Sequence, residues 1–251
     1  MLKLFRKREP RPLSAPAGER LYAIGDIHGC LDLLDRLLDA IDADHAARPP
    51  ATRTIIFLGD LIDRGPESAG VVERVRERIA AGDARLILGN HEEVFAAAAR
   101  GDSKATRALY RMEGAPTMES YGLTPTEIES GSFEDLARLL AQRVPAEHLA
   151  LLEKGEDLIR IGDYVFVHAG INHRAPLDEQ STRDLRWIRE PFLGHPGNPE
   201  FVVVHGHTPA PEIENQPYRI GIDTGAVFTG TLTAVGLEGE ARWFLDTREA
   251  A

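Results

Sequence analysis

Three short apolar runs in the first third of the chain each end in a glycine followed by a polar residue. They are Leu21–Ile24 before Gly25-Asp26, Thr54–Leu58 before Gly59-Asp60, and Leu86–Leu88 before Gly89-Asn90. Apolar residues recur three or four positions apart after the first two runs, and the helix-prone sequence EEVFAAAAR follows the third. Strands that alternate with helices are typical of parallel βαβ units, which bind ligands at the carboxyl ends of their strands. The polar residues at these strand ends are therefore the first candidates for a site.

The rest of the chain has two different patterns. The stretch from about 101 to 156 is polar and helix-prone, and we expect a helical insertion that caps the site. The last third is strand-like, with a hairpin of Leu158–Ile161 and Tyr164–Val167 followed by Phe201–Val204, Tyr218–Ile222, Val227–Val235 and Arg242–Leu245. One parallel and one largely antiparallel set of strands predict an α/β fold with two packed sheets and helices outside.

Composition and charge exclude several classes of protein. The chain has 251 residues, 43% of them hydrophobic, and a formal net charge of −11. This acidic balance argues against a protein that coats nucleic acid or an anionic membrane. No apolar run approaches the roughly 18 residues that a membrane span needs. The lone Cys30 excludes an internal disulfide and favours a reducing compartment, so we expect a cytoplasmic protein.

Residues 1–20 differ from the remainder of the chain. They contain six basic residues, two acidic residues and three prolines. Such a composition buries little apolar surface, and we expect a flexible basic tail over 1–20 ahead of a single domain over 21–251.

Eight residues near the predicted strand ends have side chains that bind metals or transfer protons. They are Asp26 and His28 in GDIHG, Asp60 and Asp63 in GDLIDRG, Asn90 and His91 in GNHE, His168 in VHAG, and His207 in HGHTP. One such motif alone is compatible with a turn or a hydrogen-bonded core residue, but packing does not account for five in order. Carboxylate, imidazole and amide ligands together suit divalent manganese, iron or zinc. A shared aspartate would create a two-metal site of the kind used for phosphoryl transfer.

These motifs resemble those of the calcineurin-like metallophosphoesterases, and more narrowly those of the phosphoprotein phosphatase group with its small bacterial and phage members. The resemblance covers about Leu21 to Phe244 and implies a four-layer α/β/β/α sandwich with a two-metal hydrolytic site. It implies two divalent ions, with manganese preferred and iron or zinc as alternatives. Carried over by motif, the metal ligands are Asp26 and His28 on the first ion, Asp60 as the bridge, and Asn90, His168 and His207 on the second.

The resemblance also implies roles in catalysis and phosphate binding. A hydroxide that bridges the metals would attack phosphorus in line, and His91, oriented by Asp63, would protonate the leaving oxygen. Arg64 and Arg189 would clamp the phosphoryl oxygens together with Asn90, since a guanidinium matches such oxygens with two parallel hydrogen bonds. Arg186 is the less favoured alternative to Arg189.

Two substrate classes remain open. The leading prediction is a phosphatase for phosphoserine and phosphothreonine proteins, with phosphotyrosine also in range. The alternative is a hydrolase of small dinucleoside polyphosphates such as diadenosine tetraphosphate. Glu113 stands where many small bacterial relatives have an asparagine, and an acid at the substrate mouth would disfavour polyphosphates. A catalytically silent binding module is disfavoured, because every expected ligand position is filled.

The remaining cysteine and histidines are interpreted as structural. Cys30 and Arg36 have the C-x5-R spacing of cysteine-dependent phosphatases, but the interval has helical periodicity and two aspartates instead of a glycine-rich phosphate loop. His205 is expected to line the sheet or to lie behind the metal ligands. The other four are expected at the surface: His45, His148, His173 and His195.

Overall fold

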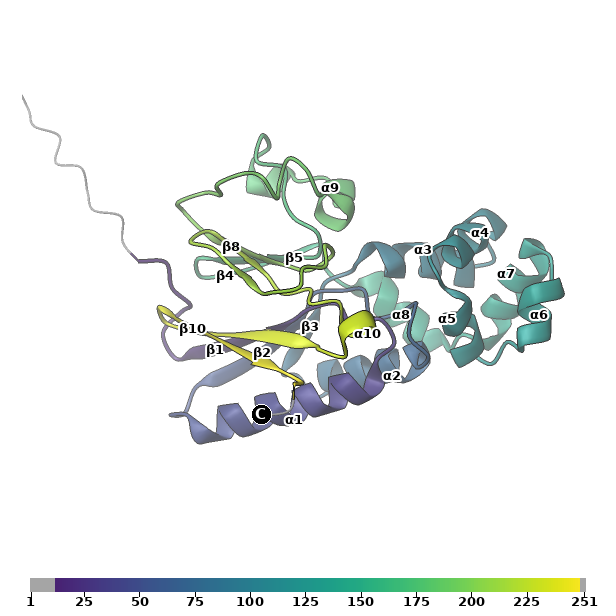
Figure 1. Cartoon of the computed structure of the whole chain (residues 1–251), viewed down its shortest axis with the longest axis horizontal. Helices are drawn as coiled ribbons and strands as arrows, with labels where there is room; N and C mark the ends of the chain where they lie inside the picture. Colours follow the sequence, from purple (N-terminus) through teal and green to yellow (C-terminus); the bar gives the residue numbers. More distant parts are fainter. Residues whose placement is uncertain (1–11, 249–251) are drawn as a thin grey trace, which may run out of the picture.

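Two five-stranded sheets form the centre of the computed structural model, which describes residues 12–248 (Figure 1). The first sheet has the order β10-β9-β1-β2-β3 and the second β4-β5-β6-β8-β7. The strands of the first are β1 Glu19–Ile24, β2 Thr52–Phe57, β3 Ala84–Leu86, β9 Thr233–Glu238 and β10 Ala241–Asp246. Those of the second are β4 Leu158–Ile161, β5 Tyr164–Val167, β6 Val202–His205, β7 Glu214–Asn215 and β8 Arg219–Gly221.

Helices cover the outer faces of both sheets. Figure 1 shows α1 (Leu31–Ala47) and α2 (Ser68–Ala80) along the first sheet and α9 (Thr182–Trp187) beyond the second. A short 3-10 turn, η1, at Leu177–Glu179 precedes α9. The predicted four-layer α/β/β/α sandwich is confirmed.

Alternation along the strands explains why both faces of each sheet are buried. In β1, Leu21 and Ala23 belong to the apolar core between the two sheets, whereas Tyr22 and Ile24 belong to the core beneath the helices. Successive side chains of a strand point to opposite faces, so an uninterrupted apolar run fills two cores at once. The strand β5 repeats this arrangement in the second sheet.

The strand directions differ from the sequence prediction, because each sheet is mixed. In the first, β1, β2 and β3 are parallel, while β9 pairs antiparallel with β1 and β10 pairs antiparallel with β9. In the second, β5, β6 and β8 are parallel, with β4 and β7 antiparallel at the two edges. The prediction of one parallel and one largely antiparallel sheet was wrong, since periodicity indicates which face is buried but not which strand pairs with which.

The polar middle segment is a series of helices that extends to one side of the sandwich (Figure 1). It follows α3 (Asn90–Ala99) and contains α4 Ser103–Arg111, α5 Ala115–Ser120, α6 Pro125–Ser130, α7 Phe133–Arg143 and α8 Ala146–Lys154. Side chains of Asp102, Thr124 and Ser132 accept backbone N–H groups at the starts of α4, α6 and α7. These N-caps explain why so polar a sequence divides into short helices.

The ordered domain begins before Leu21, so the predicted extent of the flexible tail is wrong. The backbone N–H of Ser14 donates to Asp163 Oδ2 at 3.0 Å, and that of Ala15 donates to the carbonyl of Gly239 at 2.8 Å. Arg20 is fully buried in β1. The part of the predicted tail over 1–11 lies outside the described residues. Within residues 12–248, no helix has the length and apolarity to cross a membrane.

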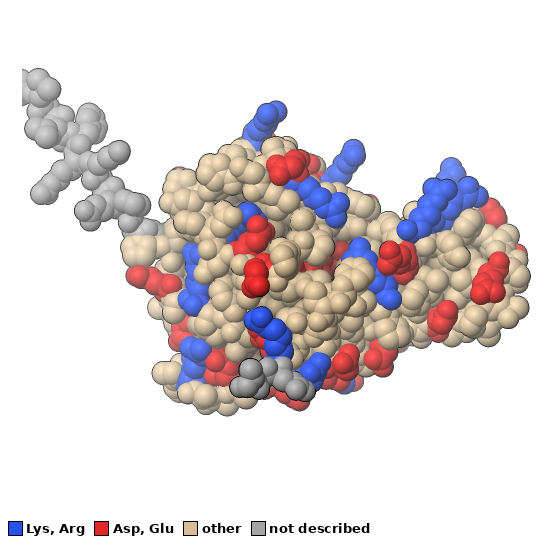
Figure 2. All heavy atoms as spheres, in the orientation of Figure 1, with Lys and Arg blue, Asp and Glu red and all other residues tan. Residues whose placement is uncertain are grey.

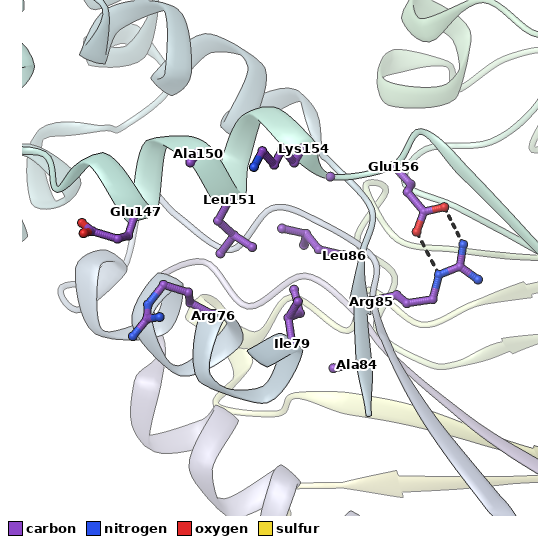
Figure 3. Close-up of a pocket in the computed structure, with 11 residues that line it drawn as sticks. Arg76, Ile79, Ala84, Arg85, Leu86, Glu147, Ala150, Leu151, Lys154 and Glu156 are labelled. Carbon is purple, nitrogen blue, oxygen red and sulfur yellow. Dashed lines mark hydrogen bonds and ion pairs between the residues drawn. The ribbon is translucent and has the colours of Figure 1, made fainter. Parts of the chain in front are cut away.

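Acidic and basic side chains are interspersed on the face shown in Figure 2. A cavity of about 340 Å³ lies between α2 and α8, beside the edge strand β3. Figure 3 shows Ile79, Leu86 and Leu151 pointing into it, and Arg85 at its rim paired with Glu156 by two hydrogen bonds of 2.8 and 2.5 Å. The described residues that line this cavity include none of the predicted site residues.

Candidate active site

Eight of the predicted site residues lie where strands of both sheets end. Asp26 and His28 follow β1, Asp60 and Asp63 follow β2, Asn90 and His91 begin α3 shortly after β3, His168 follows β5, and His207 follows β6. Four of them have left-handed backbone, with φ of 48° at His28, 48° at Asp60, 71° at Asp63 and 67° at His207. Non-glycine residues in this region are strained and cluster at functional sites, where sharp turns redirect side chains.

Asp60 is the centre of the cluster. Its Oδ2 atom lies 3.8 Å from His28 Nε2, 3.8 Å from His91 Nε2 and 3.4 Å from His168 Nε2. His168 Nε2 in turn lies 3.1 Å from both Asn90 Oδ1 and His207 Nδ1. Two metal-capable groups result, His28 with Asp60 and His91, and Asp60 with His168 and His207. Asp60 belongs to both groups.

The protonation of two histidines indicates that the cluster fits cations. His28 Nδ1 lies 2.7 Å from the Ile62 carbonyl and His168 Nδ1 lies 2.8 Å from the Leu58 carbonyl. A carbonyl oxygen only accepts, so each Nδ1 carries a hydrogen, and each Nε2 is the ring atom that faces the Asp60 carboxylate. An unprotonated Nε2 would present a lone pair to this carboxylate, so the arrangement is favourable only with a positive charge at Nε2, supplied by a proton, by a cationic side chain or by a metal ion.

The electrostatics of His168 support the same conclusion. Burial lowers the pKa of His168, but the carboxylates around it, Asp60 foremost, outweigh burial and raise this pKa to about 10. The cluster therefore stabilises positive charge at its centre. Buried imidazole, carboxylate and amide donors together suit divalent manganese, iron or zinc.

Asp26 lies beside these two groups rather than within them. Its carboxylate accepts the backbone N–H of His207 at 3.1 and 3.0 Å. Burial, and then the nearby Asp223 carboxylate, raise the pKa of Asp26 well above its usual value. The structure thus places Asp26 against the His207 loop, and its assignment as a metal ligand stays a prediction.

Two buried carboxylates at the site were missed by the sequence reasoning. Asp223 follows β8 and accepts the Gly225 backbone N–H at 2.9 Å. Glu92 accepts the backbone N–H groups of Asp60, Leu61 and Gly89 at 2.8, 2.8 and 2.9 Å. The sequence contains an indication of both residues. Asp223 follows an apolar run, as Asp26 and Asp60 do, and Glu92 is the last residue of the GNHE motif.

His91 is held by a chain of hydrogen bonds that begins in the helical segment. Its Nδ1 lies 2.6 Å from Asp63 Oδ2, and Asp63 Oδ1 accepts the hydroxyl of Thr117 at 2.7 Å. Burial lowers the pKa of His91, but Asp60 and Asp63 outweigh it and raise this pKa above the ordinary value. Asp63 therefore holds the Nδ1 atom of His91, and the Nε2 atom of His91 faces Asp60 in the cluster. Thr117, in α5, was not among the predicted site residues.

The two predicted phosphate-binding arginines have different surroundings. Arg64 places Nη1 2.5 Å from His28 Nε2 and Nη2 3.5 Å from His91 Nε2. Arg189 is exposed. Burial and then His168 lower the pKa of His207 to about 3, and the positive charge of Arg189 makes a further, smaller contribution in the same direction.

Arg186 is engaged elsewhere. It donates to Asp157 at 2.7 Å and to Glu93 at 3.3 Å. The Arg189 side chain, by contrast, has no hydrogen bond or ion pair to another described residue. Arg186 is thus already paired with two carboxylates, and the assignment of Arg189 as the second phosphate-binding arginine stays a prediction.

Among the residues interpreted as structural, none of the four histidines predicted at the surface is fully exposed: His45, His173 and His195 are half-buried and His148 is buried. His205 is buried with Nε2 3.2 Å from Arg219. Burial raises the pKa of the Cys30 thiol to about 11, which is the reverse of an activated nucleophile. His148 was predicted at the surface, but it is buried and lies 3.0 Å from both Tyr121 and Glu73, because α8 packs against α2 and α3.

Comparison with known proteins identifies the family. The model of the calcineurin-like phosphoesterases matches residues 19–226. The chain belongs to this family. It is a dinuclear metal-dependent hydrolase, a metallophosphoesterase.

Individual relatives of this phosphoesterase carry different names. It is 31% identical to the asymmetrical bis(5′-nucleosyl)-tetraphosphatase PrpE of Bacillus subtilis, over 84% of this chain and 87% of that protein. Proteins of the same name from other bacteria match 84–86% of the chain. Serine/threonine-protein phosphatase 1 of Salmonella typhimurium is 30% identical over 90% of this chain and 95% of its own. A metallophosphoesterase from Sphaerobacter thermophilus has the same fold, with a TM-score of 0.52, 20% identity, and 91% and 88% of the two chains covered.

Proposed function

We propose that this phosphoesterase hydrolyses dinucleoside polyphosphates of the diadenosine tetraphosphate type. The observation that carries the proposal is the repeated match, over most of the chain, to enzymes named bis(5′-nucleosyl)-tetraphosphatase. This reverses the order of the two substrate classes predicted from the sequence. The argument from Glu113 is outweighed by these matches.

A protein phosphatase is the second candidate. The match to the Salmonella enzyme over 90% of the chain favours it. Both candidates require the same attack on phosphorus, so the residues near the cluster serve either one. The two candidates differ in the leaving group of the reaction and in the protein surface that binds this group.

The cluster residues would hold two divalent ions, for which we propose manganese. The ligands would be Asp26, His28, Asp60, Asn90, His168 and His207. When bound, such ions lower the pKa of water and neutralise charge on the phosphate. Arg64 and Arg189 would orient the phosphoryl group through paired hydrogen bonds to its oxygens, and the Arg64 guanidinium lies beside the first metal group, 2.5 Å from His28 Nε2.

His91 would donate the proton that the leaving oxygen needs. Asp63 accepts the Nδ1 hydrogen of His91 and stabilises its protonated form, so the Nε2 hydrogen is directed at the cluster. The leaving group of a polyphosphate is a phosphate, which is a far weaker base than a serine alkoxide. Hydrolysis of diadenosine tetraphosphate should therefore depend less on His91 than hydrolysis of a phosphoserine peptide.

The test is a comparison of kcat/KM on diadenosine tetraphosphate and on phosphoserine, phosphothreonine and phosphotyrosine peptides, with manganese-loaded protein and Asp60→Asn as the blank. We expect a preference of at least about tenfold for the tetraphosphate. Chromatography of the products then separates cleavage into AMP and ATP from cleavage into two ADP. A tenfold preference for any peptide would replace the proposal with the second candidate.

A further inference from the structure

One aromatic ring lies beside the candidate active site and is left in solvent. The side chain of Phe228, in α10 (Ala226–Thr229), is 69% exposed. Its ring centroid lies 5.9 Å from Cζ of Arg64, whose Nη1 is 2.5 Å from His28 Nε2. The Arg64 guanidinium therefore contacts both this ring and a histidine of the metal cluster. Figure 1 shows α10 at the end of the sheets where α3 begins.

The backbone holds Phe228 in this position. Gly225 and Gly230 flank the single turn of α10 with left-handed φ of 67° and 71°, which favours glycine at both ends. The Phe228 N–H donates to the Gly225 carbonyl at 2.8 Å, and the Thr229 hydroxyl donates to the Thr224 carbonyl at 2.9 Å. A ring on a fixed turn loses little conformational freedom when a ligand covers it.

Packing does not account for this ring. Phe228 has no aromatic neighbour among residues 12–248 and contributes to none of the three apolar cores. Phe228 interacts with the Arg64 side chain through a cation–π contact, and most of the ring remains exposed to solvent. A planar apolar surface next to a phosphate-binding arginine can contact the group that is attached to the phosphate.

We propose that Phe228 is a stacking platform for a nucleobase of the substrate. The inference rests on the proposed function and adds a specificity-determining residue to it. With the phosphate held at Arg64, the attached nucleoside extends toward α10, where its base covers the exposed ring. Every nucleobase has a π-face, so this contact favours nucleoside phosphates over bare phosphates without selecting one base.

The test compares Phe228→Ala and Phe228→Trp with the control Tyr110→Ala. Tyr110 is also an exposed aromatic residue, but its ring packs on Phe133. Calorimetry on manganese-loaded protein gives the Kd for ADP and for inorganic pyrophosphate, and kinetics gives the KM for diadenosine tetraphosphate. We expect Phe228→Ala to weaken ADP binding and raise the KM about tenfold, with pyrophosphate binding unchanged. Phe228→Trp should bind ADP at least as tightly as the unaltered protein. The control Tyr110→Ala should have the same Kd for ADP and the same KM as the unaltered protein.

Three results would overturn the inference. Equal losses for ADP and pyrophosphate would mean that the ring acts only by positioning Arg64. Unchanged ADP binding in Phe228→Ala would remove the platform, although turnover of the tetraphosphate by the unaltered protein would still support the proposed function. Absence of any preference for ADP over pyrophosphate in the unaltered protein would exclude a nucleobase subsite. Failure of the proposed function alone would instead appear as turnover restricted to phosphopeptides.

Discussion

His91 shows how a single side chain acquires a role from residues that do not reach the substrate. Asp63 bonds its Nδ1, and Thr117 bonds the other oxygen of Asp63. The Thr117 hydroxyl also accepts the Asp63 backbone N–H at 2.8 Å. One hydroxyl of α5 thereby fixes both the backbone and the carboxylate of the residue that orients His91. The helical segment contributes to the chemistry through this contact.

We predict that Thr117→Val lowers kcat about 10- to 100-fold on a phosphoserine peptide and less on p-nitrophenyl phosphate. Valine keeps the shape of threonine but leaves Asp63 Oδ1 without its hydroxyl donor, so proton donation by His91 suffers most where the leaving oxygen is strongly basic. Thr117→Ser restores the hydroxyl and should recover the peptide activity. An equal loss on the two substrates would show that Thr117 is merely structural.

At the scale of elements, Glu92 joins the first turn of α3 to the loop that follows β2. It accepts three buried backbone N–H groups from residues 60, 61 and 89. Residues 60 and 61 follow β2 and residue 89 follows β3, so the three donors come from the ends of two adjacent strands. The position of Asp60 relative to Asn90 and His91 therefore depends on this one carboxylate.

Replacing Glu92 by Gln should destabilise the protein by about 1–3 kcal/mol, since an amide NH₂ would face a backbone donor that has no other partner. Urea denaturation of the metal-free protein measures this loss. The matched control is Glu93→Gln, one residue along the same helix, where the side chain is 45% exposed. Its effect should stay within about 0.5 kcal/mol, as for most surface substitutions. Equal stability of the two variants would contradict the role assigned to Glu92.

Elements also show where sequence reasoning succeeds and fails. The strand-end motifs were found because each is local, with an apolar run, a glycine and a polar residue in direct succession. The apolar residues Val227 and Phe228 favoured one strand over Val227–Val235, but the structure has α10 followed by β9. Left-handed backbone at Gly225 and Gly230 turns the chain there. Thr117 could not be found, because its partner Asp63 is 54 residues away and no local pattern links them.

At the scale of the whole molecule, the candidate active site joins the two sheets. Asp26, Asp60 and Asn90 follow strands of the first sheet, and His168 and His207 follow strands of the second. The mixed topology of each sheet did not follow from periodicity. The proximity of these residues was still predicted, because parallel strands of both sheets end at the same edge. Cations in this position would connect the two halves of the sandwich.

Binding of manganese should therefore stabilise the entire domain. At a free concentration about 100 times the Kd, a ligand that binds only the folded state adds about 2.7 kcal/mol. For a chain of this size, that corresponds to a rise in Tm of roughly 5–10 °C. Asp60→Asn removes the carboxylate common to both metal groups and should abolish the rise, whereas Asp178→Asn, an exposed aspartate in η1, should retain it. Calorimetric melting curves recorded with manganese and with a chelator measure the rise in Tm for each variant, and this measurement needs no substrate. An unchanged rise in Asp60→Asn would place the stabilising ion elsewhere and remove the basis for a site shared between the sheets.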